Sequence, residues 1–185
     1  GVVVSAVRSM RKKGINCTWV GSWYDKGAEN KKLEESLGPN YVPIFLPAQL
    51  EENYYAGFCK QVLWPLLHYQ MIQSSFNVKW WNAYVLANEI FADTIANIYK
   101  KGDLIFVQDY HLMLLPKLLR ERFPDAKIGF FLHTPFPTSE LYRTLAPRTD
   151  ILKGLLGANL LGFQTWDYSR HFFSTLTRIL GVEFN

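Results

Sequence analysis

Two short apolar runs, each followed by polar residues, form the most informative pattern in this chain. Leu104–Val107 leads to Asp109, and Ile128–Leu132 leads to His133. The residues between the runs, Met113–Phe123, have the apolar spacing of a helix. A strand, a helix and a second strand in this order predict two parallel, neighbouring strands joined by a crossover. Asp109 and His133 should then lie at the carboxyl ends of these strands, where open α/β sheets bind small molecules.

The rest of the chain also alternates between helical and strand-like patterns. Val78–Lys100 shows the most regular helical periodicity, and Gly102 is placed to end that helix. Pro65 is expected to kink or end a helix predicted over Glu51–Tyr69. Thr149 is expected to cap a helix that runs to about Leu156. Further helices are predicted over Val3–Lys13, which Gly14 should end, and Trp166–Leu180, and further strands over Asn16–Gly21, Tyr41–Leu46 and Asn159–Phe163.

Strands and helices alternate from residue 103 onward, which predicts an α/β fold with a doubly wound, mainly parallel sheet. The chain begins on a predicted helix, whereas a doubly wound domain usually opens with a strand. It also ends just after a helix. This order predicts a single domain, residues 1–185, cut from a longer protein, with its first strand and a C-terminal lobe absent.

Composition and charge narrow the possible functions. With 185 residues, 49% of them apolar and 16% aromatic, the chain can form a full core and line a pocket or an interface as well. The net charge of +4 fits an anionic ligand such as a phosphate, but it is too small and too scattered to indicate nucleic-acid binding. Arg143 and Arg148 could meet a phosphate, although exposed arginines are more often solvated.

The common signatures of catalytic, metal and export sequences are absent. Cys17 and Cys59 have no metal-binding spacing, and no two histidines have the i, i+4 spacing of a helical zinc site. The sequence has no G-x-S-x-G, P-loop or G-x-G-x-x-G pattern, so we expect neither a serine nucleophile nor a metal. With no visible signal peptide or membrane-spanning run, we expect a cytoplasmic protein without membrane partners.

An ordered set of uncommon motifs is present instead. In chain order they are Tyr54-Tyr55-Ala56-Gly57-Phe58, Val62-Leu63-Trp64-Pro65-Leu66-Leu67-His68-Tyr69, Gln108-Asp109-Tyr110-His111-Leu112, Phe131-Leu132-His133-Thr134-Pro135-Phe136-Pro137, Leu161-Gly162-Phe163-Gln164-Thr165 and Asp167-Tyr168-Ser169-Arg170-His171-Phe172. With these motifs the chain resembles the N-terminal, acceptor-side lobe of the trehalose-6-phosphate synthases. That family consists of retaining glycosyltransferases with two Rossmann-like lobes in the GT-B arrangement. The resemblance covers nearly all of the chain.

The resemblance implies a reaction for the whole protein. The family transfers glucose from UDP-glucose to glucose 6-phosphate and forms trehalose 6-phosphate and UDP in a cleft between the lobes. No metal or other cofactor is needed, and the leaving phosphate helps to take the acceptor's proton. A homo-oligomer or the subunits of a trehalose-synthase complex are possible partners. The chain alone is expected to be inactive.

The resemblance also implies where the acceptor binds. Tyr55 matches the tyrosine that contacts the phosphate of glucose 6-phosphate, and a phenol can donate a hydrogen bond to an anion. Trp64 matches the tryptophan that packs against the acceptor sugar, and Trp23 is assigned to the same substrate. Taken alone, Tyr55 and Trp64 read more naturally as core residues of a helix.

Two residues are expected to be catalytic by the same resemblance. Asp109 matches the aspartate that accepts hydrogen bonds from acceptor hydroxyls. His133 matches the histidine beside the transferred glucose, and both His133 and Gly1 are assigned to donor binding.

The chain departs from the family pattern at several positions, and two interpretations stay open. The family's N-terminal arginine has no match, Val2 replaces a donor-binding glycine, Ser22 displaces Trp23 by one position, and Gln108 replaces a histidine. The first interpretation is a lobe of an active synthase. The alternative is a catalytically degenerate synthase-like module of a regulatory subunit or a synthase–phosphatase fusion, acting in binding or assembly.

Overall fold

The computed structural model describes residues 9–23, 40–71 and 76–183. Internal contacts divide the chain into two compact units, Gly1–Leu46 and Pro47–Asn185. In the described part of the chain, no helix is both long enough and apolar enough to cross a membrane.

The first unit contains a two-stranded parallel sheet made of β1 (Trp19–Trp23) and β2 (Tyr41–Phe45). The Arg11 guanidinium donates hydrogen bonds from Nη2 to the carbonyl oxygens of Cys17 and Asn40, both at 2.9 Å. These carbonyls lie just before the two strands, so one side chain ties both strand starts to the helical residues 9–12.

The second unit is built on a three-stranded parallel sheet in the order β3-β4-β5. Its strands are β3 (Leu104–Gln108), β4 (Lys127–Leu132) and β5 (Leu160–Phe163). Helix α6 (Leu115–Arg122) joins β3 to β4, which confirms the predicted crossover. Alternate side chains of β4 are buried where α6 packs on the strand, namely Ile128, Phe130 and Leu132.

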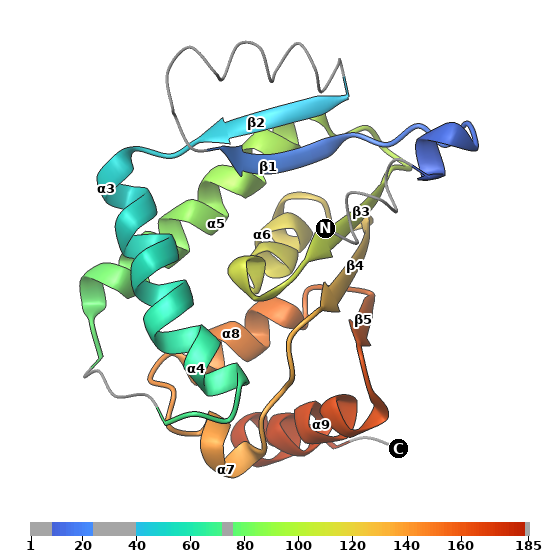
Figure 1. Cartoon of the computed structure of the whole chain (residues 1–185). Coiled ribbons are helices and arrows are strands. Elements are labelled where there is room, and N and C mark those ends of the chain that lie inside the picture. The colour runs from blue at the N-terminus through green and yellow to red at the C-terminus, as the bar shows by residue number, and fades with distance from the viewer. Residues whose placement is uncertain (1–8, 24–39, 72–75, 184–185) are drawn as a thin grey trace. The chain divides into compact units, whose positions relative to one another are not determined.

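The other elements of the second unit are helices. They are α3 (Ala48–Glu51), η1 (Glu52–Leu63), α4 (Trp64–Leu67), α5 (Val78–Ile98), the short 3-10 helix η2 (Tyr110–Leu112), α7 (Ser139–Tyr142), α8 (Arg148–Leu155) and α9 (Trp166–Leu180). Figure 1 shows α5 lying beside the run from α3 to α4, and α6 packs between α5 and β4. Both α5 and α9 lie where their apolar periodicity predicts them.

A continuous helical run extends from α3 through η1 to α4. Its middle, η1, is a π-helix of 12 residues, in which hydrogen bonds span five residues instead of four. Pro65 does not end this run, because it lies in the first turn of α4, where its missing N–H costs little. The helix type changes at Trp64, just before the proline.

The start of α8 differs from the sequence prediction. Pro147 is the N-cap residue and no side chain caps the helix, so the predicted capping role of Thr149 is wrong. Pro147 leads directly into the helical turn, which places Thr149 inside that first turn. The preceding short helix, α7, had no counterpart among the elements expected from the sequence.

Candidate active site

Asp109 and His133 lie side by side at the carboxyl ends of β3 and β4. The Asp109 N–H donates to the carbonyl oxygen of Phe131 at 2.8 Å, which extends the strand pairing by one residue. Oδ1 of Asp109 accepts hydrogen bonds from the backbone N–H groups of Tyr110 at 2.9 Å and His133 at 3.3 Å. The carboxylate therefore bridges the two strand ends that the sequence pattern brings together.

The backbone of Asp109 is strained. Its φ is 70° and its ψ is 174°, a region that residues other than glycine rarely enter. Strain of this kind costs about 1–3 kcal/mol and persists only where surrounding contacts hold the residue in place. The two N–H groups on Oδ1 supply such contacts, so the fold holds a carboxylate where glycine would fit more easily.

His133 is oriented by the last residue of β3. Its Nε2 lies 2.8 Å from Oε1 of Gln108. An amide oxygen can only accept a hydrogen bond, so Nε2 carries the ring proton in the neutral form and Nδ1 can act as an acceptor. Gln108 therefore fixes the direction in which His133 presents Nδ1.

His111 links the strand ends to η1. Its ring stacks on that of Tyr55, with centroids 5.7 Å apart and planes 9° from parallel. Burial lowers the pKa of His111 to about 4; the Asp109 carboxylate opposes this shift and the Lys60 ammonium adds to it. His111 is therefore neutral at neutral pH and serves as a flat packing surface. Together, Asp109, His111 and His133 form the strand-end cluster.

Tyr55, Lys60 and Trp64 share one side of the helical run and form what we call the helix face. The Lys60 Nζ lies 4.5 Å from the ring centroid of Trp64 and 5.2 Å from that of Tyr55. Residues five apart are rotated by about 140° around an α-helix. In a π-helix, whose hydrogen bonds span five residues, they come close to the same side. The π-helical form of η1 therefore brings Tyr55 and Lys60 together.

Lys60 is a functional candidate that the sequence motifs do not single out. Its only signal in the sequence is isolation, because no other lysine or arginine lies between Lys32 and Lys79. The structure places its ammonium over exposed aromatic rings, since Tyr55 is 36% and Trp64 40% exposed. Neither ring is therefore a core residue, and the helix face combines one positive charge with two open aromatic surfaces.

Two buried hydroxyl groups belong to residues that follow members of the strand-end cluster in the chain. Within the described residues, Tyr110 Oη and Thr134 Oγ1 have no hydrogen-bond partner. Tyr110 follows Asp109 in the chain, and Thr134 follows His133. Burial raises the pKa of Tyr110, so its hydroxyl stays protonated and can donate. Buried hydroxyls require partners, and each of these two can therefore bond to a polar molecule that reaches it.

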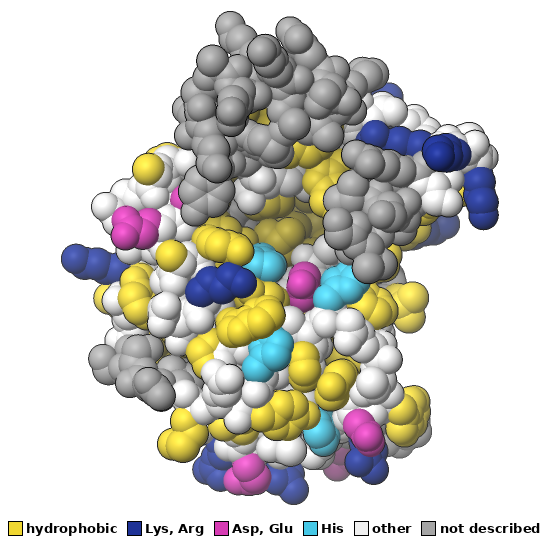
Figure 2. Space-filling model, viewed as in Figure 1, with side chains coloured by type: hydrophobic (Ala, Val, Ile, Leu, Met, Phe, Trp, Pro, Cys, Tyr) yellow, Lys and Arg dark blue, Asp and Glu magenta, His cyan; other side chains and the backbone are white. Residues whose placement is uncertain are grey.

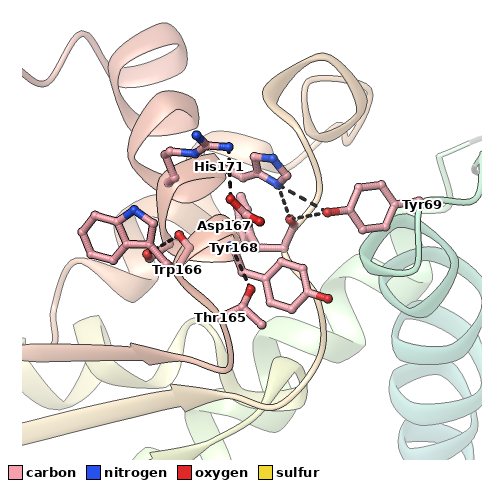
Figure 3. A network of polar contacts seen from close by, with 9 residues as sticks. Tyr69, Thr165, Trp166, Asp167, Tyr168 and His171 are labelled. Atoms are coloured by element: carbon pink, nitrogen blue, oxygen red, sulfur yellow. Dashed lines mark hydrogen bonds and ion pairs between the residues drawn. The ribbon is translucent and has the colours of Figure 1, made fainter.

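The segment after His133 is anchored at Phe136. The Phe136 carbonyl oxygen accepts hydrogen bonds from His171 Nδ1 at 3.0 Å and from the Tyr69 hydroxyl at 3.2 Å. Figure 3 shows Tyr69, which follows α4, and His171, on α9, meeting at this point. The buried Phe136 ring also packs edge-on against Phe172 of α9. The segment that follows His133 is thus held by elements that are distant in the sequence.

Figure 2 shows histidine, acidic and basic side chains gathered among hydrophobic ones on one face of the molecule. The strand-end cluster offers hydrogen-bond acceptors, and the helix face offers a cation with two aromatic surfaces. This combination suits a ligand with hydroxyl groups, an anionic group and a flat apolar face, as in a phosphorylated sugar. Among the described residues, no group of His, Cys, Asp or Glu side chains is arranged to hold a metal ion.

The predicted site residues of the second unit converge on this region, namely Tyr55, Trp64, Asp109 and His133. Two further predicted residues belong to the first unit. Trp23 is the last residue of β1, and its side chain lies outside the described part of the structure. Gly1 lies outside the described residues.

Comparison with known proteins also indicates a protein that acts on sugars. The model of glycosyltransferase family 20 matches residues 1–185. A curated relative is alpha,alpha-trehalose-phosphate synthase A (UDP-forming) of Dictyostelium discoideum. It is 43% identical over 185 residues, which cover 99% of this chain and 25% of the relative.

Solved structures share the fold. An E. coli trehalose-6-phosphate protein bound with UDP-2-fluoro glucose has a TM-score of 0.84 and 32% identity, covering 97% of this chain and 40% of that chain. The N-terminal domain of Candida albicans trehalose-6-phosphate phosphatase has a TM-score of 0.80 and 40% identity. That match covers 90% of this chain and 36% of the Candida chain. These matches confirm the expected Rossmann-like α/β class with parallel strands. The chain spans from 25% to 40% of the length of the three proteins.

Proposed function

Because this chain belongs to glycosyltransferase family 20, we propose that the whole protein is a UDP-forming trehalose-6-phosphate synthase. It transfers glucose from UDP-glucose to glucose 6-phosphate and forms trehalose 6-phosphate and UDP. The relative from D. discoideum is named for this activity, and the E. coli structure is bound with a fluorinated UDP-glucose. The approach of the helix face to the strand-end cluster, through the stacked rings of Tyr55 and His111, carries the proposal.

The helix face is the proposed binding site of the acceptor. The Lys60 ammonium and the Tyr55 hydroxyl donate to the phosphate of glucose 6-phosphate, the first as a charge and the second as a neutral donor. Trp64 presents an open indole face, which suits the apolar face of a pyranose ring. The cation and the two rings together select a sugar that carries an anionic group.

The strand-end cluster orients the reacting groups. Oδ2 of Asp109, which bonds neither of the N–H groups held by Oδ1, accepts hydrogen bonds from acceptor hydroxyls and so aims one of them at the donor sugar. The bond from the donor's anomeric carbon to UDP breaks as the bond to the acceptor oxygen forms. The acceptor's proton passes to the leaving phosphate. His133, with Nδ1 available, lies beside the transferred glucose and holds one of its hydroxyls.

The remaining assignments belong to the same proposal. Trp23 contacts the acceptor, and Gly1 approaches the donor phosphates. The protein acts in the cytoplasm, as a homo-oligomer or with other subunits of a trehalose-synthase complex. Cys17 and Cys59 are free thiols, which fits a reducing compartment.

Release of UDP by the purified full-length protein tests the reaction. The protein should release UDP when both UDP-glucose and glucose 6-phosphate are present, and far less with UDP-glucose alone. Trp64→Ala should raise the KM for glucose 6-phosphate about three- to tenfold, because it removes an aromatic contact. Trp166→Ala is the matched control, since this indole is 78% exposed on α9 and lies outside the helix face.

A wild-type protein that binds glucose 6-phosphate but releases no UDP would overturn the proposal that the protein is a synthase. That result would leave a sugar-phosphate-binding module, and Trp64→Ala would then still weaken binding measured by calorimetry. Equal effects of the two tryptophan substitutions would contradict the placement of the acceptor on the helix face.

A further inference from the structure

Three arginines from separate elements line one cavity of about 460 Å³ in the second unit. Arg143 follows α7, Arg148 opens α8, and Arg178 lies in the last turn of α9. These helices are neighbours, as Figure 1 shows, because α9 packs on both α7 and α8. The cavity shares no lining residue with the strand-end cluster or the helix face.

The charges in this cavity are not balanced. Glu140 is its one acidic lining residue, so three arginines leave an excess of two positive charges. Glu140 pairs with Arg178 at 2.6 Å and with Arg143 at 3.4 Å. Arg148 has no carboxylate partner within the described residues, and its Nη1 donates only to the nearby carbonyl oxygen of Leu145 at 3.3 Å. One guanidinium is therefore free to bind an anion.

The N-terminal end of α8 adds further hydrogen-bond donors. The backbone N–H groups of Thr149 and Asp150 have no backbone acceptor among the described residues, and no side chain caps the helix. Ser139 and Thr149 also line the cavity. Guanidinium groups, helix N–H groups and hydroxyls are the groups that bind phosphate oxygens in proteins.

The ion pairs of Glu140 do not close this site. Both carboxylate and guanidinium groups are well exposed, with side-chain exposures of 59% to 67%. Exposed ion pairs contribute little to stability, so an incoming anion can share the guanidinium groups of Arg143 and Arg178 at small cost. The cavity volume lies within the range of small-molecule sites, which is more than a bare ion needs.

We propose that this arginine-lined cavity between α7, α8 and α9 binds a phosphorylated small molecule of sugar-phosphate size, at a second site distinct from the proposed active site. Recognition uses Arg143, Arg148 and Arg178 for the phosphate and the hydroxyl groups of Ser139 and Thr149 for the rest of the ligand. The inference does not depend on the glycosyl-transfer reaction.

Hydrogen exchange of the full-length protein, read by mass spectrometry, tests the site. The probes are inorganic phosphate and ribose 5-phosphate, each compared with sodium chloride at equal ionic strength and used up to about 20 mM. Peptides that cover residues 138–150 and 174–183 should exchange more slowly with both probes. Ribose 5-phosphate should give half-maximal protection at a lower concentration than inorganic phosphate.

Substitutions make the test specific. The double variant Arg148→Gln and Arg178→Gln should need at least a tenfold higher probe concentration for half-maximal protection. Each substitution removes charge-assisted hydrogen bonds to the phosphate. Lys153→Gln, on the exposed side of α8, is the matched control and should change nothing. Arg178→Gln alone is the fallback if the double variant does not fold, since its side chain is 59% exposed.

Three results would overturn the proposal. The first is an absence of protection in both peptide regions at the highest probe concentration. The second is protection that the arginine variants leave unchanged. The third is protection confined to peptides that contain Tyr55, Lys60 or Asp109, which would assign the phosphate to the proposed active site alone.

Discussion

Asp109 has a structural role and, in the proposed function, a chemical one, and two substitutions separate them. Asp109→Asn keeps an oxygen that can accept the N–H groups of Tyr110 and His133, so stability should stay near that of the wild type. UDP release should fall at least tenfold, because hydrogen bonds to a charged acceptor are lost. Asp109→Ala leaves both N–H groups unpaired and should in addition cost about 1–3 kcal/mol of stability. Urea unfolding and the UDP assay measure the two effects, and a fully active asparagine variant would contradict the chemical role.

His111 should make stability depend on pH. Its pKa falls from an ordinary 6.5 to about 4 on folding, mainly through burial. Between these two pH values His111 binds a proton in the unfolded chain but not in the folded chain. Stability is therefore lost as pH falls from about 6.5 to about 4. The loss is on the order of 3 kcal/mol. In urea unfolding at several pH values, His111→Phe should flatten this part of the profile, whereas an unchanged slope would assign it to other groups.

Lys60 should determine how well the acceptor's phosphate is recognised. Lys60→Met keeps the length and apolar part of the side chain but removes its charge, so the KM for glucose 6-phosphate should rise tenfold or more. The kcat should change little, because the group lies over the aromatic rings of the helix face rather than in the strand-end cluster. Lys60→Arg is the control that keeps the charge. Steady-state kinetics measure both constants. A fall in kcat with an unchanged KM would contradict a role of Lys60 in binding the acceptor's phosphate.

At the scale of elements, local signals predicted most of the fold. The helices α5 and α9 were predictable because each has a sustained apolar period and a glycine with positive φ soon after its end, Gly102 and Gly181. Strands β3 and β4 were predictable because short apolar runs flank a helical pattern. These signals lie within single segments and do not depend on distant contacts.

Features that depend on distant contacts were not predictable. Apolar spacing does not distinguish hydrogen bonds over five residues from those over four, so it predicts neither the π-helical form of η1 nor the position of Lys60 over the two aromatic rings. The stacking of Tyr55 on His111 joins residues 56 positions apart, and only the folded chain shows it. The motif resemblance predicted four site residues that the fold brings into one region of the second unit, but it gave no information on the side chains between them.

The packing of α8 on α6 leaves no room for a side chain at Gly154. A Cβ added there would lie 2.8 Å from Cα of Leu114 and even nearer to the carbonyl oxygen of Met113. Backbone atoms cannot rotate away, so Gly154→Ala should destabilise the protein by about 1–3 kcal/mol. The neighbouring, exposed Lys153→Ala is the control and should be close to neutral. Thermal unfolding of both variants checks this, and a stable Gly154→Ala would show that the two helices can separate freely.

At the scale of the whole molecule, this chain by itself should not catalyse the transfer. It covers 40% of the E. coli protein bound with UDP-2-fluoro glucose, and the remainder of that protein has no counterpart in these 185 residues. The resemblance described above implies a site in a cleft between two lobes, and closure of such a cleft would place donor against acceptor. The purified 185-residue chain should release UDP no faster than a protein-free control. Clear turnover would mean that one lobe suffices.

The backbone of Asp109 links folding to natural selection. If selection acted on folding alone, position 109 should drift towards glycine, because glycine occupies a φ of 70° with a ψ of 174° at little cost. If the proposed function holds, selection for turnover acts in the opposite direction and retains the carboxylate. A variant library enriched for soluble expression and one enriched for trehalose production should therefore favour different residues at this position. The aspartate found here is the residue that the second kind of selection would keep.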